Sequence, residues 1–164
     1  NYQLKRIYAW LRPDEYPQES MQQQNSIIAI GSGQLYGKGL NNDEVGSVKN
    51  GNFISEPQTD FIFAVAGEEI GFIGCCILII LEFLIAFECL LIGRRAKLLS
   101  GTLICCGMAA QIFFQTFINI SVATGLMPNT GIALPFVSYG LTSLISFCIG
   151  IGFVLNVGLQ TRKY

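Results

Sequence analysis

The stretch FIGCCILIILEFLIAFECLLIG, residues 72–93, decides the fold class of this chain. Apart from Glu82 and Glu88, it is apolar or small throughout. A helix needs roughly 20 such residues to cross the hydrocarbon core of a bilayer. Lipid offers no hydrogen-bond partner to a bare backbone, so the segment must be helical to satisfy its own amides. We therefore predict a membrane-spanning helix here.

Two further stretches have the same character, at about residues 101–123 and about 135–159. Only 13% of the chain is charged, against about 25% in a typical soluble domain. The sequence thus predicts an all-α integral membrane protein with about three transmembrane helices after a long extracytoplasmic loop. We expect that loop region over residues 1–54 and the membrane helical region over residues 55–164, both within one partial domain.

Basic residues give the orientation of these spans. Arg94, Arg95 and Lys97 lie in the short link after the first span, and Arg162 and Lys163 follow the third. The link at about residues 124–134 has no basic residue. Since cytoplasmic loops are enriched in Lys and Arg, we expect the C-terminus in the cytoplasm and the N-terminal region outside.

Composition excludes several classes of function. The net charge of −1 gives no reason to expect nucleic acid as a partner. The chain has no His, and its six cysteines lie within the apolar stretches without a CxxC spacing, so a zinc site is not predicted. We interpret the cysteines as small packing residues. Because the chain begins with Asn1, we expect it to be a piece of a longer polypeptide.

Polar residues within the spans are costly and need an explanation. Gln111, Gln115 and Asn119 follow an i, i+4, i+8 spacing, which places three amides on one face of the second span. They either form hydrogen bonds between helices or line a substrate groove. Gly67 and Gly71 form a small-xxx-small pattern, which permits close helix contact.

The segment before the first span carries acidic residues at a predicted helix start. Ser55 and Gln58 have the spacing of a capping box, with Pro57 in the first turn, so we expect a helix from about Ser55 onwards. Glu56 and Asp60 would then share one face at the outer edge of the membrane. Either they only complement the positive helix N-terminus, or one of them is a general base.

Three blocks of the sequence resemble one family. AIGSG at 29–33 with GKGL at 37–40 resembles its glycine-rich outer loop. EPQTDFIFA at 56–64 with GEEIG at 67–71 resembles its acidic signature, and GLMPNTGIALPFVSYG at 125–140 resembles its most specific signature. On these motifs the chain is identified as a member of the FtsW/RodA/SpoVE (SEDS) family of peptidoglycan polymerases, of which it covers the C-terminal part.

The resemblance implies a fragment of a roughly ten-helix fold in the bacterial cytoplasmic membrane. It implies a peptidoglycan glycosyltransferase that polymerises lipid II at the outer face of the cytoplasmic membrane, in elongation, division or sporulation. The implied partner is a class B penicillin-binding protein. The family's proposed catalytic acid corresponds to Asp60, which would deprotonate the acceptor hydroxyl for a single displacement with inversion. We expect the fragment alone to be inactive.

Further substrate contacts follow from the same comparison. The pyrophosphate of lipid II needs a cation, for which Lys38 or a divalent metal ion is a candidate. Glu56 and Thr59 flank the implied base. Ser138 and Tyr139 would line the same cleft, although capping and interfacial anchoring explain these two equally well.

This sequence departs from the family pattern at two positions, and two other functions stay open. Ser55 stands where the family usually has Pro, and Leu141 where it usually has Gly. The first alternative is a lipid II flippase, with the amides of the second span as its polar path. The second is a non-catalytic scaffold for the transpeptidase.

Overall fold

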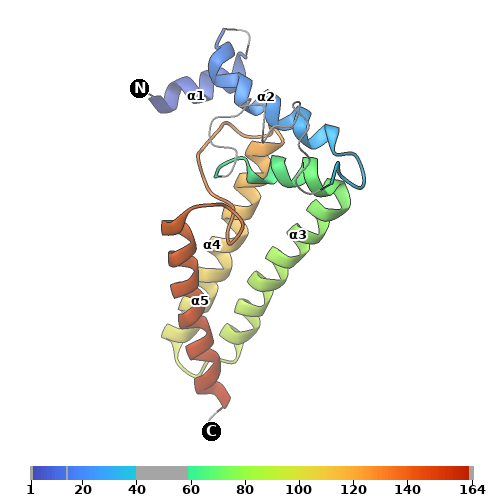
Figure 1. Ribbon diagram of the computed structural model, residues 1–164. Coiled ribbons are helices and arrows are strands. Elements are labelled where there is room, and N and C mark those ends of the chain that lie inside the picture. The colour runs from blue at the N-terminus through green and yellow to red at the C-terminus, as the bar shows by residue number, and fades with distance from the viewer. Residues whose placement is uncertain (1, 14, 40–58, 163–164) are drawn as a thin grey trace.

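The computed structural model describes residues 2–13, 15–39 and 59–162. These residues form five α-helices, namely α1 (Tyr2–Leu11), α2 (Pro17–Ser32), α3 (Ile62–Arg94), α4 (Leu99–Ala123) and α5 (Leu141–Arg162). In Figure 1, α3, α4 and α5 run along the molecule, while α1 and α2 lie across one end of it. We call α1, α2, residues 59–70 and residues 124–140 together the cap.

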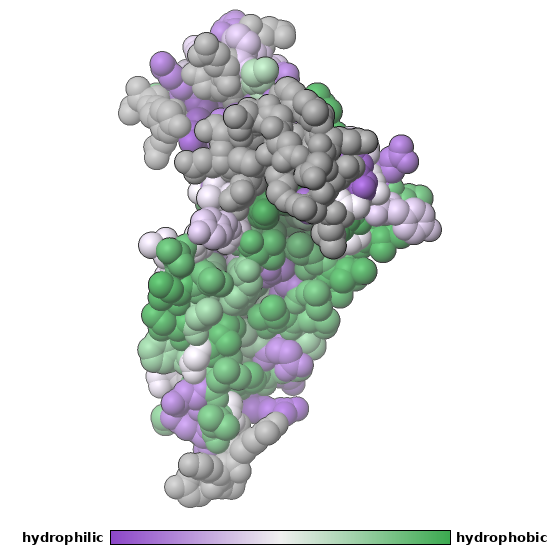
Figure 2. Space-filling model, in the orientation of Figure 1, coloured by the Kyte–Doolittle hydropathy of each residue, from purple (hydrophilic) through white to green (hydrophobic). Residues whose placement is uncertain are grey.

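Three of the helices, α3, α4 and α5, are long and apolar enough to cross a membrane. Figure 2 shows hydrophobic side chains over this part of the molecule and hydrophilic ones gathered towards its two ends. This confirms the predicted all-helical class with three candidate spans. The basic residues Arg94, Arg95 and Lys97 lie in and beside the α3–α4 link, at the end opposite the cap.

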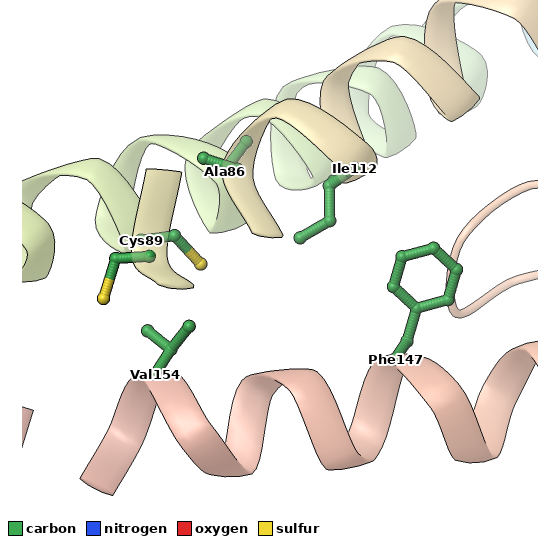
Figure 3. Close-up of a cluster of buried hydrophobic side chains, with 7 residues drawn as sticks. Ala86, Cys89, Ile112, Phe147 and Val154 are labelled. Carbon is green, nitrogen blue, oxygen red and sulfur yellow. The ribbon is translucent and has the colours of Figure 1, made fainter. Parts of the chain in front are cut away.

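Small side chains let the three spans pack closely. The core between them comprises Ala86, Cys89, Cys105, Ala109, Ile112, Phe147 and Val154, several of which are shown in Figure 3. A Cβ on Gly93 of α3 would lie only 2.9 Å from the Cβ of Cys105 on α4. The described cysteines are all free, and Cys75, Cys89 and Cys105 are buried, which agrees with a packing role.

Helix α3 is broken at Gly71, just before the predicted span. The backbone there has φ 67° and ψ −171°, a conformation that only glycine adopts readily. The break leaves the N–H groups of Phe72 and Ile73 without helical partners, and they donate to the carbonyls of Gln34 and Leu35 at 2.9 and 3.2 Å. The turn after α2 therefore docks into the break.

The same turn satisfies the other side of the break. The N–H groups of Lys38 and Gly39 donate to the carbonyls of Glu68 and Glu69 at 2.9 and 3.1 Å. Residues 62–70 consequently run across the end of the spans, beneath α2, before α3 turns down into the bundle (Figure 1). This short helical segment positions the turn that precedes it.

Two predicted helix starts are wrong. Thr59, Asp60 and Phe61 form a turn, and α3 begins at Ile62 rather than near Ser55. The first carbonyl to accept helical bonds is that of Phe61, from Ala64 and Val65. The carbonyls of Thr59 and Asp60 are instead bonded to side chains outside the helix.

The third span also begins later than predicted, at Leu141 rather than Pro135. Phe136 has a φ of 58°, which takes the backbone out of the right-handed helical region. The first helical bond runs from the Leu144 N–H to the Gly140 carbonyl at 2.9 Å. Residues 128–140 therefore lie outside α5 and form part of the cap.

The predicted extracytoplasmic loop region, residues 1–54, is largely helical where it is described. It contains α1 and α2, and Gly31 belongs to the last turn of α2 rather than to a loop. Pro17 at the first turn of α2 suits a helix start, because the missing N–H would have had no partner there. The capping box at Ser55–Gln58 lies outside the described residues.

Candidate functional site

Asp60, the predicted catalytic residue, lies in the turn that leads into α3. Its side chain is half-buried in the cap, at the end of the candidate spans. The buried Asn119 of α4 holds this turn: its Nδ2 donates to the Asp60 carbonyl at 2.9 Å and to the Ile132 carbonyl at 2.7 Å. One amide thus ties the Asp60 turn to the loop between α4 and α5.

Ser138 makes a second tie at the same place. Its Oγ donates to the Thr59 carbonyl at 2.7 Å and accepts from the Leu134 N–H, also at 2.7 Å. The side chain is buried, and its single proton is already committed to Thr59. Ser138 therefore lies next to the Asp60 turn, with its hydroxyl engaged in holding that turn.

Tyr139 and Thr59 complete the neighbourhood of this turn. The Tyr139 side chain follows Ser138 and is 73% exposed on the cap. Thr59 is half-buried beside Asp60. Glu56, the remaining acidic candidate, lies outside the described residues.

Lys38 lies away from this turn. Its Nζ pairs with Glu68 Oε1 at 3.0 Å, and the Glu68 side chain is only 3% exposed. Glu68 lies in α3, which starts at Ile62, and the helix rises roughly 9 Å from Ile62 to Glu68 at 1.5 Å per residue. The ion pair between Lys38 and Glu68 therefore joins the docked turn to α3.

Arg6 of α1 is a neighbour of Asp60 that the sequence analysis did not identify. Its Nη1 donates to the Asn129 carbonyl at 3.2 Å. A Cβ built on Gly131 would lie 3.5 Å from both Arg6 Nη1 and Asp60 Oδ2, so these atoms are at most twice that distance apart. A guanidinium and a carboxylate thus share one side of Gly131.

Helices α1 and α2 fix the loop that carries Gly131. Trp10 Nε1 donates to the Gly125 carbonyl at 2.8 Å. Gln23 Nε2 donates to the carbonyls of Val122 and Met127, and the buried Ser26 Oγ donates to that of Ala123. Side chains of α1 and α2 therefore hold the end of α4 and the start of the loop through hydrogen bonds.

The site as described combines one carboxylate, one guanidinium and a set of engaged backbone carbonyls. Among residues 2–13, 15–39 and 59–162, no group of three or more His, Cys, Asp or Glu could hold a metal ion. A half-buried carboxylate beside a guanidinium can accept a proton from a substrate hydroxyl. It is held at the boundary between the cap and the apolar spans.

The chain is similar to a family of known proteins. Residues 1–163 match the family model FtsW/RodA/SpoVE, described as cell cycle protein. The chain is 35% identical to the probable peptidoglycan glycosyltransferase FtsW of Moranella endobia, over 98% of this chain and 42% of that protein. It is 41% identical to stage V sporulation protein E of Bacillus subtilis, over 98% of this chain and 43% of that protein.

A solved structure shows the same fold. A chain from a peptidoglycan synthase complex, described as coordinating polymerization and crosslinking, aligns with a TM-score of 0.71 at 30% identity. The alignment covers 99% of this chain and 43% of that one. This chain therefore spans less than half the length of the proteins it resembles. Since the family model matches nearly all of its residues, the chain belongs to the FtsW/RodA/SpoVE family of cell cycle proteins.

Proposed function

We propose that the protein to which this chain belongs is a peptidoglycan glycosyltransferase that polymerises lipid II at the outer face of the cytoplasmic membrane. The observation that carries the proposal is the Asp60 side chain, half-buried at the end of the spans, in a turn whose Asp60 backbone carbonyl accepts a hydrogen bond from Asn119. Relatives named as probable peptidoglycan glycosyltransferases, at 35 and 37% identity, support the class of reaction.

In this reaction Asp60 is the general base. It accepts the proton of a sugar hydroxyl on the acceptor lipid II, and the oxygen attacks the anomeric carbon of the donor strand. The bond from that carbon to the pyrophosphate breaks, and undecaprenyl pyrophosphate leaves with the electron pair. One displacement inverts the configuration at the anomeric carbon, by analogy with inverting glycosidases.

The surrounding residues have different parts in this proposal. Ser138 and Asn119 hold the backbone on either side of the base, through the carbonyls of Thr59 and Asp60. Tyr139, Thr59 and Glu56 are proposed to contact the sugar and peptide of the substrate. Lys38 is paired with Glu68, so a substrate contact through it would require the pyrophosphate to compete with that carboxylate.

The proposed partner is a class B penicillin-binding protein. The cap is proposed to lie at the outer face of the cytoplasmic membrane. The solved relative is a peptidoglycan synthase complex, which supports a protein partner for this chain. The absence of basic residues from the α4–α5 link supports the orientation.

The proposal is tested by lipid II polymerisation with the full-length protein and its cognate transpeptidase, comparing wild type with Asp60→Asn. We expect glycan strands from the wild type and a loss of at least about 100-fold for the variant, since a general base contributes 10²–10⁴-fold. Equal expression and equal melting temperature would show that the fold is intact. Strands from both proteins would move the base to another residue. Strands from neither folded protein would favour the scaffold or the flippase.

A further inference from the structure

We propose that Arg6 is a positioning residue for the base Asp60, a role that rests on the function proposed above. The guanidinium would join α1 to the loop around Gly131 and hold the Asp60 carboxylate in one orientation. Three observations carry this inference: the bond from Arg6 to Asn129, the shared contact at Gly131, and the way in which α1 is fastened.

The first two observations place the guanidinium between the loop and the base. Arg6 Nη1 donates to the Asn129 carbonyl at 3.2 Å. The same nitrogen and Asp60 Oδ2 would each lie 3.5 Å from a Cβ on Gly131. A guanidinium has five N–H donors in a fixed plane, so it can bind a carbonyl and a carboxylate at once. Its charge also stabilises the anionic form that a base needs.

Gly131 makes this close arrangement possible. Its φ is 71°, in the left-handed region that residues with a Cβ seldom adopt. The Gly131 N–H donates to Asn129 Oδ1 at 3.1 Å, which closes a tight local turn. The loop therefore presents the Asn129 carbonyl to Arg6 and a bare Cα surface to both charged groups.

The third observation concerns the rigidity of α1. Trp10 is one turn after Arg6 on α1, and its Nε1 is bonded to the Gly125 carbonyl at 2.8 Å. Ala9 between them is buried. Two side chains one turn apart thus bind the same loop at Gly125 and Asn129, which fixes Arg6 relative to Asp60.

The geometry favours positioning over binding of the leaving group. In a single displacement the base and the leaving group lie on opposite faces of the anomeric carbon. Arg6 lies with Asp60 on one side of Gly131, where it accompanies the base. Loss of the guanidinium should therefore lower kcat much more than it raises KM for lipid II.

The test uses the full-length protein with its cognate transpeptidase and purified lipid II. The variants are Arg6→Gln, Arg6→Lys, Asp60→Asn and the matched control Arg12→Gln. Arg12, directly after α1, is also cationic, but it pairs with Glu15 at the surface, where both side chains are more than half exposed. We expect Arg6→Gln to lower kcat by about 100-fold with KM changed by less than about threefold, since a misplaced group can cost that much.

The other variants separate the possible causes. Arg6→Lys should recover part of kcat, because it keeps the charge but loses the planar fork. Arg12→Gln should behave as the wild type. A kcat for Arg6→Gln within twofold of wild type would overturn the positioning role, and so would a raised KM with unchanged kcat.

Failure of the proposed function gives a different pattern. An inactive wild type would remove both proposals together. An active Asp60→Asn with an impaired Arg6→Gln would overturn the role of Arg6 towards Asp60 while leaving the reaction in place. A loss in Arg6→Gln that Arg6→Lys does not relieve, with a lowered melting temperature in both, would identify a purely structural residue.

Discussion

Asn119 illustrates how a single side chain supports this site. Its amide stands at the outer end of a row of three, yet the three have different surroundings: Gln111 is exposed, Gln115 is half-buried and Asn119 is buried. Only Asn119 reaches the turn of Asp60 and the loop at Ile132. Within the described residues, Asn119 therefore binds the cap through hydrogen bonds, whereas Gln111 at the other end of the row is exposed.

Asn119→Leu should destabilise the protein by about 2–4 kcal/mol, since it leaves two carbonyl groups without their donor. Thermal unfolding in detergent would measure the loss, and polymerisation should fall with it because the Asp60 turn is released. Gln111→Leu, on the same helix face, is the matched control and should change stability by less than about 0.5 kcal/mol. A comparable loss in the control would show that the rest of the protein uses the Gln111 amide.

At the scale of elements, the break in α3 organises the cap. Gly67 and Gly71 fit one small-xxx-small pattern, but each is small for its own reason. At Gly67, a Cβ would lie 3.1 Å from Ile30 of α2, so the glycine permits close packing. At Gly71, the backbone itself requires glycine, and the freed backbone groups bind the turn after α2.

Gly71→Ala should therefore cost about 3 kcal/mol or more, because the backbone strain adds to a steric clash. An added Cβ would lie 2.8 Å from the backbone carbon of Leu35 and still closer to Gly37. Gly107→Ala on α4, where nothing lies within 4 Å, should leave the melting temperature unchanged or slightly raised. Equal melting temperatures for the two variants would contradict a required break at Gly71.

At the scale of the whole molecule, the spans present a largely apolar surface. The spans expose many large apolar side chains, among them Phe72, Leu81 and Phe114. Lipid can bury these side chains, and so can protein segments that correspond to the part of the relatives not covered by this chain. The buried Glu82 of α3 has an oxygen, Oε2, without a partner among the described residues, so this carboxyl adds a polar group inside the bundle.

The proposed orientation predicts which positions a membrane-impermeant maleimide can label in intact cells. With the native cysteines replaced by alanine, Thr130→Cys in the cap should react from outside. Ser100→Cys at the start of α4 should react only after the membrane is permeabilised, since both positions are exposed but lie at opposite ends. The reverse pattern would place the cap in the cytoplasm and exclude lipid II polymerisation by Asp60 at the outer face.

The sequence by itself determined the three spans, their approximate limits and the candidate base. These features depend on local composition and spacing, because a run of apolar residues must form a helix in lipid whatever surrounds it. The start of α4 and the end of α3 were predicted to within two residues for the same reason. Asp60 was found through a motif that resembles a family, and Ser138 was proposed for the same cleft on the same grounds.

Only the tertiary structure decided the cap. Helix α2 buries Ser26 and Ala29 while Ile27 and Ile28 stay exposed, so its apolar pattern does not mark a core face. The turn before α3 is held by bonds from Asn119 and Ser138, residues distant from it in the chain. Arg6 and Asp60 lie near each other at Gly131, although more than fifty residues separate them in the chain. Sequence spacing carries no signal for such a pairing. Long-range contacts set these features, since each backbone carbonyl takes whichever donor the folded chain brings to it.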